Sequence, residues 1–328
     1  MDWAASLPLF GLTALATMVI GALAGVLAVV AVRRRVLGCD PCHRHRALVV
    51  LAALPASIGA TLLLSAALPP IVALVIPALD HCGAHDDVHA HLCFRHAPDS
   101  IPSWVQLTLL AAVAIATTKL VRTLVRLRRA SRVLRTLIRS GDADATLDVT
   151  IVETPLPICM TVGLLHPRIV IARELLAGLA PQQREIELAH ERAHSTRRDT
   201  LSMAVARALG SLHLPSVARW ISTELDIAAE QACDEAAAER VGDRVAVAAT
   251  ILAMRRAWLV DPGTIGALGH GFAMQALERR VRALLAEPLS PDSLAVHRWC
   301  LLSCLALVLA CAGALHHWTE SAVSHVAL

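Results

Sequence analysis

Uncharged apolar runs bordered by arginines dominate the first third of the chain and return near its end. They cover residues 7–32, 47–79, 101–118 and 299–315. A helix of about 20 residues crosses the apolar core of a bilayer, so each run is long enough, or nearly so, to span it. The pattern predicts an α-helical membrane protein with four transmembrane helices, the second of them kinked by its prolines.

Composition supports this prediction and indicates how the chain is oriented. Hydrophobic residues make up 56% of the chain, charged residues only 17%, and the mean hydropathy is +0.58. Arginines follow the first run at 33–35 and the third run at 122–139. Because Lys and Arg concentrate on the cytoplasmic side of a membrane, we expect a multi-pass protein of the cell inner (cytoplasmic) membrane with both termini outside.

The apolar runs divide the chain into three parts. We expect residues 1–121 to hold three transmembrane helices with a Cys/His loop on each side. Residues 122–297 then form a cytoplasmic domain, and residues 298–328 form the fourth transmembrane helix and a short outer tail. The domain opens with an amphipathic arginine-rich segment, 122–139. Because it leaves a membrane span, we interpret it as lying against lipid headgroups and expect no direct contact with nucleic acid.

Both loops of the first part carry residue types that bind metals. The inner loop, expected at 33–46, contains four of them: Cys39, Cys42, His43 and His45. They could form a zinc or thiol site, or simply belong to a basic turn. The outer loop, 80–100, has five histidines and two cysteines and could sense a metal ion; a merely polar loop is the alternative.

The middle part combines strands and helices. Residues 146–153 and 169–171 are predicted strands, because β-branched residues gather there and prolines flank them. Prolines also confine neighbouring segments to edges or turns, and an extended substrate could pair with an edge strand near the site. Further along, we expect Asp199 to cap a helix over 200–213.

The sequence His190-Glu191-Arg192-Ala193-His194 carries the clearest chemistry. Pro181 suits the first turn of a helix, and on that helix two histidines four residues apart share one face. They can bind a single Zn²⁺, while Glu191 takes a proton from the water that the metal activates. The motif predicts hydrolysis of peptide bonds; a solvated charged helix is the alternative.

A catalytic zinc site has three protein ligands, so one more donor is needed. Glu230 is the best candidate, because it lies on a second helical pattern. Asp234 follows one turn later on the same face and could accept a hydrogen bond from a ligand imidazole. Glu224 and Glu235 are the competing donors.

These residues carry a resemblance to a known family. The run from His190 to Asp199, followed by Glu230-Gln231-Ala232-Cys233-Asp234, resembles the BlaR/MecR-type membrane zinc metallopeptidases. These antirepressor proteins are gluzincin relatives of the HtpX and CAAX-protease families. The segment from Pro157 to Ile171 is similar to the strand that precedes their catalytic helix.

The resemblance implies a cytoplasmic α+β gluzincin-like zinc metallopeptidase domain. It makes His190, His194 and Glu230 the ligands of Zn²⁺ and Glu191 the general base. It also implies a signalling role, in which the protein cleaves a cytoplasmic BlaI/MecI-type transcriptional repressor in response to an outer cue. Two alternatives stay open: an HtpX-like quality-control protease for membrane proteins, and a non-catalytic membrane signalling scaffold, against which the intact Glu191 argues.

The chain departs from the antibiotic sensors of that family in one respect. They carry a large outer penicillin-binding domain after the last span, which we do not expect here. An S-x-x-K acylation motif is also impossible, because Ala116 stands three residues before Lys119, the sole lysine. The sequence leaves the trigger and the oligomeric state open.

Zinc peptidases also need a donor for the developing oxyanion. The chain has no tyrosine, which excludes one common solution. His270, Arg279 and Arg280 are candidates, the last two in a segment, 277–282, that resembles a helix of the family. The sequence does not choose among them.

Overall fold

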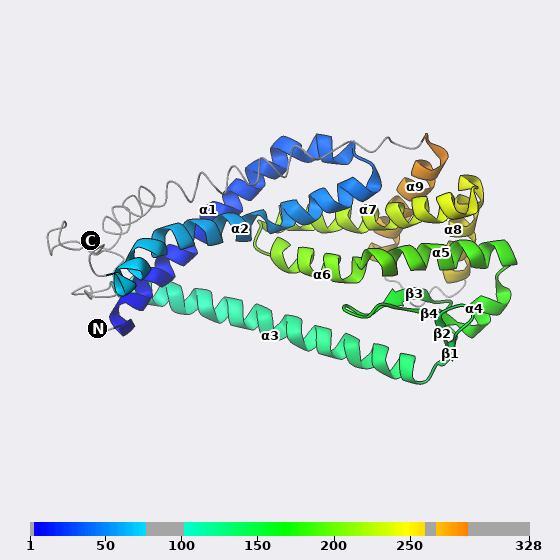
Figure 1. Cartoon of the computed structure of the whole chain (residues 1–328), viewed down its shortest axis with the longest axis horizontal. Helices are drawn as coiled ribbons and strands as arrows, with labels where there is room; N and C mark the ends of the chain where they lie inside the picture. The colour runs from blue at the N-terminus through cyan, green and yellow to red at the C-terminus, as the bar shows by residue number, and fades with distance from the viewer. Residues whose placement is uncertain (1–2, 77–101, 260–266, 288–328) are drawn as a thin grey trace.

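The computed structural model describes residues 3–76, 102–259 and 267–287 (Figure 1). The predicted fourth transmembrane helix, 299–315, and the outer histidine-rich loop, 80–100, lie outside these residues. The elements follow in the order α1 (Trp3–Leu37), α2 (Pro41–Val75), α3 (Ser103–Arg139), β1 (Asp142–Asp144), β2 (Val149–Val152), β3 (Cys159–Val162), β4 (Arg168–Ala172), α4 (Arg173–Gly178), α5 (Pro181–Arg197), α6 (Asp199–Gly210), α7 (Pro215–Val241), α8 (Arg244–Leu259) and α9 (Ala267–Leu285).

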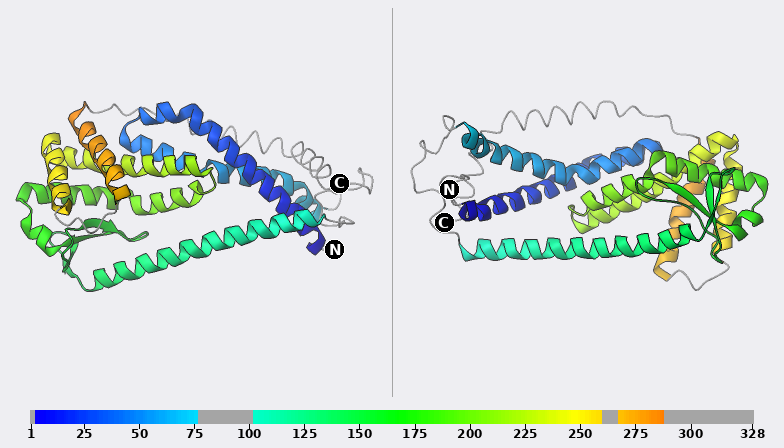
Figure 2. Two further views of the ribbon diagram at one scale, coloured as in Figure 1. Left: turned by 180° about the vertical axis from the view of Figure 1, so that it is seen from behind. Right: turned by 60° about the horizontal axis from the view of Figure 1, so that its bottom comes forward.

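Helices α1 and α2 form an antiparallel hairpin that extends away from α4–α9 (Figures 1 and 2). Two stretches within it, Leu7–Leu37 and Pro41–Val75, are long and apolar enough to cross a membrane, and α3 adds a shorter apolar stretch, Ser103–Ile115. Many of their apolar side chains face outward: Leu27 is 70% exposed and Leu64 is 62% exposed. Such exposure suits contact with lipid, so the hairpin indicates a membrane protein.

The connection between α1 and α2 is much shorter than the inner loop expected at 33–46. Helix α1 continues through the arginines to Leu37, because arginine is a good helix former. Helix α2 begins at Pro41, and the Asp40 carboxylate caps it by accepting hydrogen bonds from the backbone N–H groups of Cys42 (3.1 Å) and His43 (3.2 Å). Most of the expected loop is therefore helical.

Helix α3 is one continuous helix from its apolar start to its arginine-rich end. Residues 122–139, which we expect to lie against lipid headgroups, continue the axis of the apolar part toward the sheet (Figure 1). The reason is local: no glycine or proline occurs between Ser103 and Arg139 to bend the helix. The contact of residues 122–139 with lipid headgroups stays a prediction.

A four-stranded sheet in the order β1-β2-β4-β3 lies beside α5. Strands β2 and β4 pair in parallel, and β1 and β3 pair antiparallel to them at the two edges. The predicted strands at 146–153 and 169–171 correspond to β2 and β4; the edge strands were not recognised in the sequence. Val152, Val170 and Ile171 are fully buried and form one core with Leu188 of α5.

Helices α5 and α7 pack against each other at the centre of the remaining structure. One end of α7 buries Ile221 and Leu225 against the hairpin residues Val29 and Leu48. Its other end packs with α5, α8 and α9 through small and branched side chains, including Ala237. The apolar hairpin and the α4–α9 region therefore share one core, which sets the position of α7.

The two hairpin helices approach closely at Gly21. A Cβ atom added there would overlap the backbone carbonyl oxygen of Pro55 in α2. Small residues allow such close helix packing in membrane proteins.

We predict that Gly21→Ala lowers the thermal midpoint of the detergent-solubilised protein, because overpacking costs about 1–3 kcal/mol. Gly178→Ala is the matched control, since nothing lies within 4 Å of a Cβ atom at that position. Equal midpoints for the two variants would contradict the close approach of α1 and α2.

Candidate metal centre

Helix α5 places His190 and His194 on one face. The helix begins at Pro181, with the Gln183 side chain accepting a hydrogen bond from the Ala180 backbone N–H (3.2 Å), and it ends where Arg198 adopts a left-handed conformation (φ 53°). The two imidazole rings stand one turn apart, with their centroids separated by 4.9 Å. The predicted helical spacing is therefore present.

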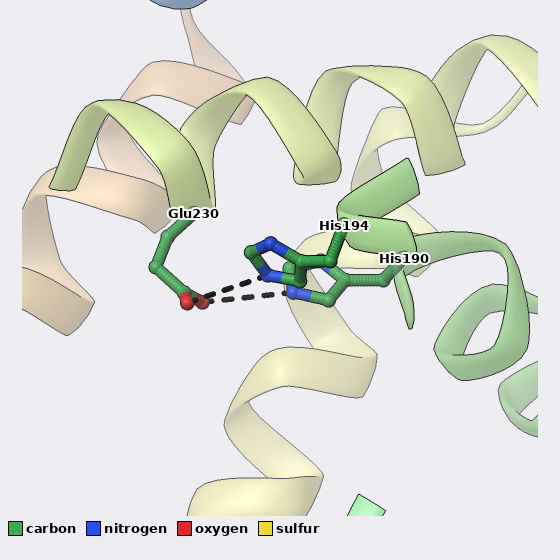
Figure 3. Close-up of side chains that lie close together, drawn as sticks. All are labelled: His190, His194 and Glu230. Atoms are coloured by element: carbon green, nitrogen blue, oxygen red, sulfur yellow. Dashed lines mark ion pairs between the residues drawn. The ribbon is translucent and has the colours of Figure 1, made fainter. Parts of the chain in front are cut away.

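Glu230 of α7 meets both imidazoles (Figure 3). One carboxylate oxygen lies 3.6 Å from Nε2 of His190, and the other lies 3.5 Å from Nε2 of His194. Donor atoms of these three residues all lie within 4.8 Å of one another. The structure thus brings together the three residues that the sequence predicts as metal ligands.

The competing donors Glu224 and Glu235 have other partners. Both carboxylate oxygens of Glu224 accept hydrogen bonds from Arg279, at 2.9 and 2.6 Å. Glu235 pairs with Arg244. Among the three acidic residues considered from the sequence, the one in the cluster is Glu230.

A carboxylate stands behind each imidazole. Asp234 Oδ1 lies 2.9 Å from Nδ1 of His190, and Asp199 Oδ2 lies 2.9 Å from Nδ1 of His194. When Nδ1 donates to such a carboxylate, Nε2 is the nitrogen left to bind a metal ion. The structure places Asp234 where the sequence predicts it.

Asp199 is a residue whose part in the site the sequence did not reveal. We expect it to cap the helix after α5, but it forms no capping hydrogen bond; it is the first residue of α6, and its side chain faces His194 and Arg197. The left-handed Arg198 reverses the chain and returns Asp199 to the end of α5. His194 and Asp199 are five residues apart and lie on either side of the end of α5, so helical periodicity does not place them together. Only the left-handed turn at Arg198 brings them into contact.

Arg280 of α9 binds the carboxylates of the site. Its guanidinium donates two hydrogen bonds to Asp234, at 2.8 and 2.7 Å, and lies 2.7 Å from Glu230. The sequence suggests Arg279 or Arg280 as an oxyanion donor, but carboxylates hold both of them. The third candidate, His270, has its side chain outside the described part of the structure.

The electrostatics of the site favour positive charge facing Glu230. Burial alone would lower the pKa of His190, but hydrogen bonds with Asp234 and Glu230 raise it to about 10. Burial would also lower the pKa of His194, but hydrogen bonds with Asp199, Cys233 and Glu230 raise it to about 12. Burial would raise the pKa of the Glu230 carboxyl, yet Arg280 and the two imidazoles hold it well below its usual range.

This balance fits a divalent cation. Metal binding to such a site replaces the protons on the histidines, so an ion can supply the positive charge that the carboxylates stabilise. Two imidazole nitrogens and one carboxylate also match the donors of a catalytic zinc site. The residues present therefore fit zinc.

Glu191 points from α5 toward the edge strand β3. The Thr161 hydroxyl lies 2.7 Å from its carboxylate Oε2 and 2.8 Å from its backbone oxygen. Thr161 thereby ties the sheet to α5 beside the two histidines. Its part was not foreseen, because β3 itself was not recognised in the sequence.

A cavity of about 730 Å³ opens in front of these residues. It is lined by His190, Glu191, His194 and Glu230, and further by side chains from β3, α6, α8 and α9. A volume in this range admits several side chains of a polypeptide. The arrangement can therefore expose a peptide bond to the candidate metal ligands and to a carboxylate.

The start of helix α2 supports the residues behind the site. Arg197, which binds Asp199, also donates to the sulfur of Cys42 (3.4 Å), and His45 lies 4.0 Å from Asp199. Arg44 donates to the side chain of Gln231, the residue after Glu230.

Within the described residues, Cys39, Cys42, His43 and His45 do not gather into the zinc or thiol site that the sequence suggests. Cys39 donates to the backbone oxygen of Arg35 (3.4 Å), and His43 pairs with Asp40. Cys42 and His45 thus contact residues behind the site, whereas Cys39 and His43 contact residues next to the α1–α2 connection.

Comparison with known proteins supplies one match. The model of the family described as BlaR1 peptidase M56 matches residues 100–284. No match was found among curated proteins or solved structures. The matched stretch makes up more than half of the 328 residues and includes His190, His194 and Glu230. The chain therefore belongs to the BlaR1 peptidase M56 family of metallopeptidases.

Proposed function

We propose that this protein is a zinc endopeptidase of the inner membrane that cleaves a cytoplasmic BlaI/MecI-type transcriptional repressor in response to a cue from outside. The observation that carries the proposal is the meeting of His190, His194 and Glu230 beside Glu191 in one cavity. Membership of the BlaR1 peptidase family supports the reaction class and the signalling role.

His190, His194 and Glu230 would hold the zinc ion. Bound there, zinc supplies Lewis-acid chemistry: it polarises the scissile carbonyl and makes water a better nucleophile. Asp234 and Asp199 keep the imidazole rings oriented, and Arg280 keeps Glu230 ionised.

Glu191 acts as the general base. Its carboxylate takes a proton from the attacking water and passes it to the leaving amine. Thr161 holds that carboxylate between α5 and β3. Because β3 is an edge strand, an extended substrate can pair with it and lie across the cavity.

The position of the arginines supports a cytoplasmic peptidase domain. Arg33–Arg35 lie at the end of α1, next to the turn whose Arg44 contacts Gln231 of α7. The candidate site therefore lies on the arginine-rich side of the hairpin. Under the positive-inside rule that side is the cytoplasm, which agrees with a layout of four spans and a peptidase domain over residues 122–297.

We predict that Glu191→Gln slows peptide hydrolysis by about 10²- to 10⁴-fold, the usual contribution of a general base, while zinc stays bound. Rates on a casein-type protein substrate and zinc content by mass spectrometry measure the two effects. Glu185→Gln, at an exposed position of the same helix, is the control. Unchanged hydrolysis in the Glu191 variant would rule out this assignment.

We predict that Glu230→Gln reduces bound zinc from about one ion per chain to well below one, because a ligand charge is lost. The measurement is metal content after dialysis against a weak chelator. Glu239→Gln, exposed on the same helix, should keep its zinc. Equal zinc content in the two variants would exclude Glu230 as a ligand.

We predict that the zinc-loaded protein cuts a purified BlaI/MecI-type repressor at one internal bond, and that the Glu191→Gln variant leaves it intact. The products are identified by mass spectrometry. In cells, a survey of cleaved proteins should find one repressor. A survey that finds many damaged membrane proteins would favour the quality-control function instead.

A further inference from the structure

One arginine in the cavity of the candidate metal centre has an edge that meets no partner within the described residues. Arg255 of α8 lines this cavity, and its Nε and Nη2 atoms are enclosed and make no hydrogen bond within the described structure. Two other arginines line the same cavity, and both are paired: Arg207 with Asp226, and Arg280 with Asp234 and Glu230. Arg255 thus differs from its neighbours.

An unpaired guanidinium in such surroundings is costly. The side chains beside it along α8 that also line the cavity, Ile251 and Met254, are apolar. A buried polar group without a partner loses its hydration and gains nothing in return, and for charged groups the loss is larger. Buried polar groups in proteins are nearly always hydrogen-bonded, so the structure points to a partner that enters the cavity from outside.

The two unpaired atoms define the chemistry of that partner. Nε and Nη2 form one edge of the guanidinium, and two parallel N–H groups on one edge match the two oxygens of a carboxylate. Polypeptides offer carboxylates as Asp and Glu side chains and as the free C-terminus. Because both atoms are enclosed, the Arg255 side chain must turn toward the cavity to meet such an acceptor, a rotamer change that is common on binding.

We infer that Arg255 is a specificity-determining residue that binds a carboxylate of the polypeptide substrate. The inference rests on the proposed function and names its substrate class: polypeptides with an acidic group close to the scissile bond. Arg255 and the candidate ligands line one cavity, so a bound carboxylate would hold the chain across the candidate metal ligands.

The first test compares cleavage preferences. The full-length zinc-loaded protein, in detergent, is incubated with a randomised peptide library whose C-termini are free or amidated, and products are identified by mass spectrometry. Asp or Glu should be enriched near the cut, or cleavage should require the free C-terminus, which separates the two sources of carboxylate. Arg255→Met should reduce this preference by at least about tenfold, as expected for a charge-assisted hydrogen bond. Arg255→Glu should select Lys and Arg instead.

The matched control is Arg256→Met. Arg256 is the next residue of α8 and is exposed, so its loss should leave the cleavage preference unchanged. Arg255→Met should also leave the thermal midpoint unchanged or raise it, because it removes two enclosed N–H groups that have no partner within the described residues. A lower midpoint would instead mean that Arg255 stabilises the fold through a partner, which contradicts the inference.

The second test measures binding without cleavage. Fluorescent acidic peptides from the library, and the same peptides with Asn, Gln and an amidated C-terminus, are titrated into the zinc-loaded Glu191→Gln protein. The acidic peptides should bind at least about tenfold more tightly than their amides. Adding Arg255→Met to the Glu191→Gln protein should abolish this difference in affinity.

The two tests separate the inference from the function on which it rests. If no peptide is cleaved but acidic peptides bind through Arg255, the proposed proteolysis fails and the carboxylate site stands. If peptides are cleaved with the same preference in wild type and Arg255→Met, the inference is overturned and the peptidase stands. Equal binding of acidic and amide peptides to the Glu191→Gln protein also overturns it.

Discussion

Three donor side chains from two helices must face one point, and each of them must be held there by a second partner. His190 has Asp234 behind it, His194 has Asp199, and Glu230 has Arg280. Without those partners the rings could rotate and the carboxylate would face two imidazoles unsupported. The carboxylates and Arg280 therefore set both the direction of the donors and the sign of the charge that the site accepts.

The rest of the fold serves this arrangement. Helices α5 and α7 supply the donors, α9 supplies Arg280, and the sheet supplies Thr161, which fixes Glu191 beside the histidines. The buried apolar side chains of β2 and β4 hold the sheet against α5. Small residues such as Ala237 allow α7, α8 and α9 to pack closely around α5. The sheet and helix α9 thus each hold one residue of the site in place, and the apolar cores hold these elements against α5 and α7.

The sequence predicted what depends on local periodicity. Helical spacing alone places His190 beside His194 and Asp234 on the face of Glu230, and unbroken apolar runs revealed α1 and α2. It did not predict what depends on contacts between distant segments or on chain reversals. Thr161 lies on a four-residue edge strand with no pattern of its own, and Asp199 reaches His194 only through the left-handed turn at Arg198.

Helix ends also escaped the sequence analysis. The inner arginines and Cys39–His45 suggest a loop with metal-binding residues, because charge and cysteine content carry no signal of where a helix ends. In the structure Asp40 and Pro41 start a new helix only three residues after α1 ends. Of the side chains that suggested a second metal site, Cys42 and His45 instead contact Arg197 and Asp199 behind the first.

The contacts of helices α1 and α2 with the α4–α9 region make the apolar hairpin and the candidate metal centre inseparable. Excising α1 and α2 would leave Ile221 and Leu225 facing water and would take away the Arg44 partner of Gln231 and the His45 neighbour of Asp199. A truncated, water-soluble version of this enzyme would lose part of the scaffold that orients its imidazoles. The apolar hairpin, a candidate membrane anchor, is thus also a structural component of the candidate metal centre.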